Sequence, residues 1–132
     1  MTDTTAKPVR RELALDDFRA EIKAQGVEKE DYAFICPACK TVQSARWLIA
    51  AGAGKEFDDV NGTVGFSCVG RFTGAGGEKL EEGKGCNWTL GGLFQIHTLT
   101  VVTPDGQKHP HFEVATSEQA AQLRDKLIDE GM

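Results

Sequence analysis

The chain begins with a polar segment, which is followed by a helical pattern of apolar positions. Residues 1–11 hold few apolar side chains, and we expect them to be disordered. The next apolar side chains recur at spacings of three and four, as they do on one face of a helix: Leu15, Phe18 and Ile22. Gly26 is a favourable C-terminal stop for such a helix. The pattern predicts a helix over residues 13–25.

The middle of the chain contains short apolar runs that lead into cysteines. Residues 32–35 and 64–68 are two such runs, and their length and composition predict strands. Residues 44–51 lie between them and predict a short helix, with Ser44 as its N-cap. Glycines and charged side chains dominate residues 69–85, which we expect to form a loop.

The last third of the chain predicts a hairpin and a second helix. Residues 93–102 are a β-prone run, residues 103–106 form a turn that contains Pro and Gly, and the chain returns as a strand to residue 114. Pro110 in the returning strand indicates a sheet edge, because proline cannot donate a ladder hydrogen bond. A capping-box sequence then starts a helix over residues 117–130.

These elements predict an α+β fold, with a small antiparallel sheet flanked by N-terminal and C-terminal helices. We expect residues 12–132 to form one domain, with the hairpin in the same sheet as the cysteine-bearing strands. The chain has 132 residues, 40% of them hydrophobic and 27% charged, which is typical of one globular domain. It has no 18-residue apolar run and no signal-peptide pattern. The expected location is therefore the cytoplasm, with no membrane partner.

The four cysteines carry the strongest chemical signal in the sequence. Cys36 and Cys39 form a C-x-x-C pair directly after an apolar run, where two thiolates can bind one tetrahedral ion from a tight turn. Cys68 and Cys86 enclose residues 69–85, which we interpret as a loop inserted into a second knuckle at a modest cost in closure entropy. The cytoplasm keeps thiols reduced, which favours metal binding over disulfides. We therefore predict one structural Zn²⁺ per chain, bound by all four cysteines.

Two other interpretations of the cysteines stay open, and two histidines add a weaker candidate. A thioredoxin-like redox pair would place Cys36 and Cys39 at the start of a helix, whereas residues 40–43 predict a turn and a short strand. Alternatively, the cysteines are unrelated core residues, because cysteine packs well in an apolar interior. His109 and His111 share one face of the returning strand and could share a metal, although histidines near a turn are more often solvated.

Several segments together resemble an uncharacterised family of small phage and prophage proteins. They are the run into the C-P-A-C pair at 32–39, the F-S-C-V-G-R segment within 64–71, and the G-C-N-W and G-G-L-F segments at 85–88 and 91–94. The resemblance covers residues 13–115, and the C-terminal helix matches it less clearly. It implies a zinc-ribbon-like protein of phage or prophage origin in the cytoplasm of a bacterial host. It implies no activity.

Three classes of function remain for an acidic chain with such a site. The formal net charge of −5 opposes attraction to phosphate backbones and favours a protein–protein adaptor for a host or phage protein. The alternative is a nucleic-acid-binding zinc ribbon that uses basic residues around the metal: Arg46, Lys55, Arg71, Lys79 and Lys84. The third class, ranked last, is a metal-dependent or thiol-redox enzyme; four cysteine ligands leave zinc no open position, so we expect no catalysis. The loop 69–85, anchored by a ligand at each end, is the expected recognition element.

Overall fold

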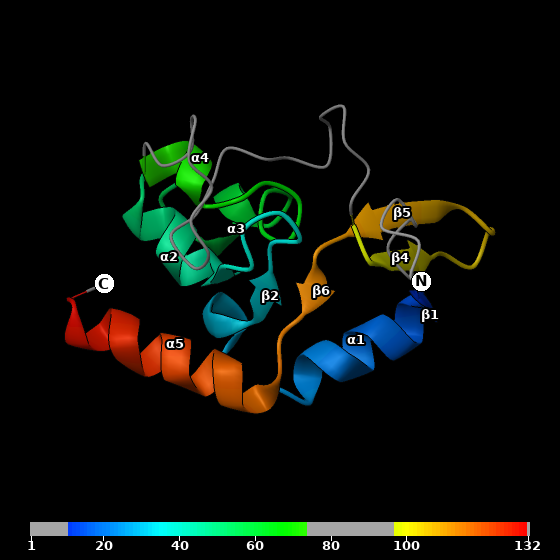
Figure 1. Ribbon diagram of the computed structural model, residues 1–132, viewed down its shortest axis with the longest axis horizontal. Coiled ribbons are helices and arrows are strands. Elements are labelled where there is room, and N and C mark those ends of the chain that lie inside the picture. Colours follow the sequence, from blue (N-terminus) through cyan, green and yellow to red (C-terminus); the bar gives the residue numbers. More distant parts are fainter. Residues whose placement is uncertain (1–10, 74–96, 132) are drawn as a thin grey trace, which may run out of the picture.

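The computed structural model describes residues 11–73 and 97–131, which form an α+β fold (Figure 1). In chain order its elements are β1 (Arg11–Ala14), α1 (Leu15–Lys23), the 3₁₀ turn η1 (Lys29–Asp31), β2 (Ala33–Ile35), β3 (Val42–Ser44), α2 (Ala45–Ala50), α3 (Phe57–Val60), α4 (Gly70–Thr73), β4 (Leu99–Val102), β5 (Lys108–His111), β6 (Glu113–Val114) and α5 (Ser117–Asp129). The disorder expected for residues 1–11 is wrong for Arg11, which begins β1, and residues 1–10 lie outside the described ranges.

The strands form two separate three-stranded sheets. In the first sheet β4 is central, with β1 parallel to it on one side and β5 antiparallel on the other. In the second sheet β2 is central and pairs antiparallel with both β3 and β6. Figure 1 shows the β4–β5 hairpin at one end of the molecule and helices α2, α3 and α4 at the other, with β2 and β6 between them.

The chain passes from one sheet to the other at Phe112. Its N–H donates to the Gly65 carbonyl at 2.9 Å, and its side chain is fully buried. The prediction that the whole hairpin belongs to the cysteine-bearing sheet is therefore wrong: β4 and β5 stay in the first sheet, and β6 alone pairs with β2. The position expected for Pro110 is confirmed, because β5 is the edge strand of its sheet.

Both predicted terminal helices are present, one with a later start. Helix α1 begins at Leu15 because the residues up to Ala14 pair with β4 as β1. Gly26 has a φ of 72° and takes the left-handed conformation expected after the helix end. The capping box of α5 is confirmed: Gln119 N–H donates to Thr116 Oγ1 at 3.1 Å, and Thr116 N–H donates to Gln119 Oε1 at 2.8 Å.

The segment that leads to Cys68 is a turn and not the predicted strand. The Val64 N–H donates to the Val60 carbonyl at 2.9 Å, which extends the helical winding of α3 by one more turn. Gly65 then takes a φ of 78°, a conformation that ends this winding and directs the chain toward Cys68. Most of the apolar run at 64–68 therefore folds as turns, and only Ser67 forms a β-bridge.

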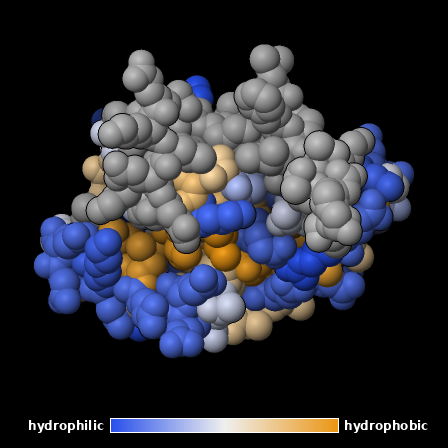
Figure 2. All heavy atoms as spheres, viewed as in Figure 1, coloured by the Kyte–Doolittle hydropathy of each residue, from blue (hydrophilic) through white to orange (hydrophobic). Residues whose placement is uncertain are grey.

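Two groups of buried side chains form the interior. The larger one combines residues of both sheets with α1, α2 and α3: Phe18, Phe34, Leu48, Val60, Leu99, Val101, Phe112 and three cysteines. The smaller one lies under α5: Ala33, Ala115, Ala120, Leu123 and Leu127. Figure 2 shows hydrophobic residues gathered in the middle of one face, bordered along its lower edge by hydrophilic side chains.

Replacing Gly65 with alanine is expected to destabilise the protein by about 2 kcal/mol or more, since it adds left-handed strain and a steric clash. A Cβ on Gly65 would lie 2.2 Å from Cε1 of His111, far inside contact distance. Gly62→Ala is the matched control, because a Cβ there would meet no atom within 4 Å. Urea unfolding of both variants tests this, and equal stabilities would contradict it.

Candidate metal centre

A tight loop between β2 and β3 carries the first two cysteines. The Cys36 N–H donates to the Thr41 carbonyl at 3.0 Å, and the Lys40 N–H donates to the Cys36 carbonyl at 2.8 Å. Lys40 has a φ of 62°, so the chain reverses within a few residues. The predicted turn and short strand after Cys39 are confirmed, because the loop ends in β3. A strand at this position does not match the helix that a thioredoxin-like redox pair needs.

The third cysteine comes from the turn after α3. Cys68 directly precedes Val69 and α4, and both residues are fully buried. Helix α4 occupies residues 70–73 of the predicted loop 69–85, so the start of that segment is helical. Residues 74–85 lie outside the described ranges.

The structure brings Cys36, Cys39 and Cys68 together into one cluster. Their sulfur atoms all lie within 4.8 Å of one another, and each residue is at most 2% exposed. The Cys39 and Cys68 sulfurs are 3.7 Å apart, well beyond the roughly 2.05 Å of a disulfide bond. In the described part of the chain, no fourth His, Cys, Asp or Glu joins this group. Three buried thiols in one place are compatible with a metal site.

Two polar side chains, one at the end of the loop and one in β3, contact the sulfur atoms. Thr41 Oγ1 lies 2.9 Å from Cys39 Sγ, and Gln43 Nε2 donates to Cys68 Sγ at 3.4 Å. The Gln43 Oε1 accepts the Val69 N–H at 2.7 Å, so this buried amide holds the segment that carries Cys68. Neither residue was identified as functional from the sequence. Their spacing of two, across the start of β3, is the signal that could have found them, because alternate residues of extended chain face the same side.

The cluster favours a thiolate on one of its three sulfurs. Hydrogen bonds from Cys36 and then from Cys68 lower the pKa of the Cys39 thiol. The reciprocal hydrogen bonds to Cys39 and Cys68, together with burial, raise the pKa of Cys36. A metal ion removes such competition for protons, since it binds the deprotonated form of each ligand.

The histidines do not belong to this cluster. His109 is exposed on β5, as expected for a histidine near a turn. The same expectation is wrong for His111, whose ring centroid lies 4.7 Å from that of Phe18 and 5.0 Å from that of Phe34. Its Nδ1 lies 2.8 Å from the Phe112 carbonyl, and burial lowers its pKa. His111 is therefore partly buried against two aromatic rings and is not a solvated surface group.

Residues 14–115 match the model of the VVA0879-like family. The chain belongs to the VVA0879-like family. The matched range includes all four cysteines and ends just before α5, in agreement with the extent of the resemblance seen in the sequence. No curated protein and no solved structure matches this VVA0879-like chain.

Cys86 is the one predicted ligand that lies outside the described residues. Of the basic residues considered for nucleic-acid binding, Lys79 and Lys84 also lie outside them. Arg46 is described, and it forms a two-pronged ion pair with the buried carboxylate of Asp31. None of the helices in the described ranges has the length and apolar character that a membrane span requires.

Proposed function

We propose that the chain binds one structural zinc ion through Cys36, Cys39, Cys68 and Cys86. The observation that carries the metal site is the spacing of the buried sulfurs. Ligand sulfurs on a tetrahedral zinc with bonds of about 2.3 Å lie about 3.8 Å apart. The 3.7 Å between the Cys39 and Cys68 sulfurs fits that geometry. Cysteine thiolates are also the ligands that structural zinc sites prefer.

The fourth ligand in this proposal is Cys86. The chain has four cysteines, and the other three already form the cluster. Closure of the site by a fourth thiolate would leave zinc without an open position for water or substrate, so the metal would hold the fold together and would not catalyse. The proposal is therefore a zinc-ribbon-like module that acts by binding and not by catalysis.

The partner in this proposal is a protein of a bacterial host. The resemblance to phage and prophage proteins supports the host setting, and the net charge of −5 supports a protein partner over a nucleic acid. The pairing of Arg46 with Asp31 adds to this, because it occupies a cation that a phosphate contact would need. A nucleic-acid-binding ribbon is the alternative outcome of the test below.

Capture from host lysate tests the adaptor function. The zinc-loaded chain, immobilised and incubated with lysate, is expected to retain a specific protein at both 50 mM and 300 mM salt, read by mass spectrometry. Nucleic-acid binding would instead weaken steeply with salt, because each phosphate contact releases counterions. Recovery of nucleic acid alone, lost at the higher salt, would replace the adaptor by the alternative.

Replacing residues 74–83 with a short Gly-Ser bridge is expected to abolish capture of that protein while zinc content and thermal stability persist. The reason is the position of the segment between two proposed ligands, which anchors both of its ends. Zinc assay, thermal melts and capture are measured on the same preparation. If capture survives the replacement, the segment is a passive insertion and the binding surface lies elsewhere on the domain.

A further inference from the structure

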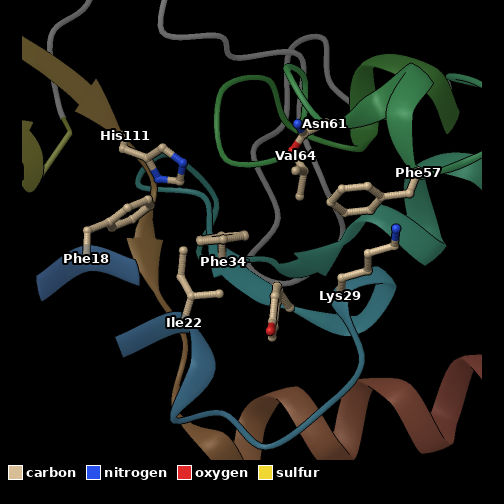
Figure 3. Close-up of a pocket in the computed structure, with 9 residues that line it drawn as sticks. Phe18, Ile22, Lys29, Phe34, Phe57, Asn61, Val64 and His111 are labelled. Atoms are coloured by element: carbon tan, nitrogen blue, oxygen red, sulfur yellow. The ribbon is translucent and has the colours of Figure 1, made fainter. Parts of the chain in front are cut away.

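A cavity of about 130 Å³ opens between α1, β2, α3 and β5, and its lining includes none of the clustered cysteines. Figure 3 shows the side chains of Phe18, Ile22, Phe34, Phe57 and Val64 surrounding this space from different elements. These side chains are aromatic or branched aliphatic, so most of the surface that an occupant would contact is apolar.

The size of the cavity decides what it can hold. Sites for cofactors and drug-sized molecules measure roughly 300–1,000 Å³, more than twice the space found here. An apolar cavity of about 150 Å³ accommodates one benzene ring. The volume of about 130 Å³ therefore suits one aromatic side chain.

The wall opposite Phe57 consists of rings against which an aromatic side chain can pack. His111 stands edge-on to both Phe18 and Phe34, at interplanar angles of 67° and 65°. Its Nδ1 lies 2.8 Å from the Phe112 carbonyl and donates to it, and burial lowers the pKa of the ring, which favours the uncharged imidazole. Aromatic rings favour edge-to-face packing, so an added ring in the cavity can pack against these three in the same way.

Charged side chains at the opening of the cavity determine which charge is favoured next to a bound aromatic ring. Lys29 lies over the Phe57 ring, with its Nζ 5.0 Å from the centroid, and both residues also line an adjoining hollow. That hollow carries the carboxylates of Glu30, Glu56 and Asp58, so three negative charges face one positive charge. A cation beside the ring is favoured there over an anion.

We propose that this cavity is an anchor site for an aromatic side chain of the partner protein, next to which the partner carries a lysine or arginine that enters the acidic hollow. The proposal rests on the adaptor function proposed above. A single buried aromatic anchor with a charged neighbour is the pattern of interface residues that dominate binding energy.

Short blocked peptides test the site on the full zinc-loaded chain. A Phe-Lys peptide is expected to shift the methyl NMR signals of Ile22 and Val64, and an Ala-Lys peptide is expected to leave them unchanged. A Phe-Glu peptide should bind about fivefold more weakly, as expected for exposed charge pairs, and the difference should shrink in high salt. No shift with the Phe-Lys peptide at millimolar concentration would overturn the site. Equal binding of the Phe-Lys and Phe-Glu peptides would overturn the basic neighbour.

Variants that fill the cavity provide a second test of the anchor site. Val64→Phe places a ring in the space from one wall, and Ile22→Phe does so from α1 if the first variant fails to fold. Either variant is expected to lose peptide binding with its zinc content unchanged. Glu30→Gln combined with Asp58→Asn should remove the preference for Phe-Lys while the aromatic anchor still binds. Tight binding of phenethylamine alone, at the affinity of the peptide, would overturn the assignment to a protein side chain.

The same variants separate this inference from the adaptor function. If the wild-type chain captures a protein from lysate and a cavity-filled variant captures it equally well, the adaptor stands and the anchor site is wrong. If the wild-type chain captures no protein, the adaptor function fails, and the peptide titration still decides whether the cavity binds an aromatic–basic segment.

Discussion

Substituting Cys36 with serine is expected to release the zinc and to unfold most of the domain. Binding of a structural zinc contributes about 10–16 kcal/mol of apparent free energy in small zinc modules, which is comparable to the whole stability of a domain. Cys36 is fully buried and its sulfur belongs to the cluster, so serine would replace a soft ligand with a buried hydroxyl. Metal analysis and circular dichroism of the purified variant measure both effects.

The matched control is His109→Ala, since His109 is exposed and lies outside the cluster. It should retain one zinc per chain and the wild-type melting temperature. A Cys36→Ser protein with full zinc content and unchanged melting would refute the metal site. Wild-type protein without any metal, and with its cysteines joined in disulfides, would refute it equally.

The Cys86→Ser variant tests whether Cys86 is the fourth ligand of the zinc. If Cys86 is the fourth ligand, this variant should lose zinc affinity by a factor similar to that of Cys36→Ser. Cobalt substitution gives a second readout, because the visible spectrum of cobalt reports the number of thiolate ligands. A variant that keeps one tightly bound metal with an unchanged spectrum would show that Cys86 is not a ligand.

The parts of the fold that are encoded locally could be predicted from the sequence. The left-handed Gly26 and the capping box at Thr116 are decided by residues a few positions apart, and both are present as expected. The C-x-x-C loop is also local, since Pro37 and Lys40 lie within the turn that joins β2 to β3. The proximity of the remote Cys68 to this loop was predicted on chemical and not local grounds, since one metal ion prefers several thiolates.

The parts that depend on distant pairing could not be predicted. The parallel alignment of β1 with β4 joins Arg11 to Leu99, and no local pattern encodes it. The chain changes sheets at Phe112, whose N–H donates to the Gly65 carbonyl, a bond that likewise joins remote segments. The partial burial of His111 also depends on distant residues, because its ring packs against Phe18 and Phe34. Periodicity along one strand assigns faces but does not say what covers them.

Removing the Arg46 guanidinium is expected to cost about 3 kcal/mol of stability, at the lower end for a buried pair because Arg46 itself is partly exposed. Its Nε and Nη2 bind the two carboxylate oxygens of Asp31 at 2.6 Å and 2.9 Å, so the guanidinium satisfies both at once. Asp31 is 1% exposed and lies in η1, while Arg46 lies in α2. Arg46→Ala would therefore leave a buried carboxylate without its cation.

Thermal melts should show this loss as a fall of about 10 °C in melting temperature. Arg124→Ala is the matched control, because Arg124 pairs with the well-exposed Asp125 at 3.0 Å and such surface pairs contribute about 0–1 kcal/mol. Arg46→Lys should fall between the two, since an ammonium keeps the charge but loses the two-pronged geometry. Equal melting temperatures for Arg46→Ala and Arg124→Ala would show that burial of Asp31 does not make its partner essential. The predicted order of melting temperatures, wild type above Arg46→Lys above Arg46→Ala, would instead show that this ion pair helps to hold η1 against α2.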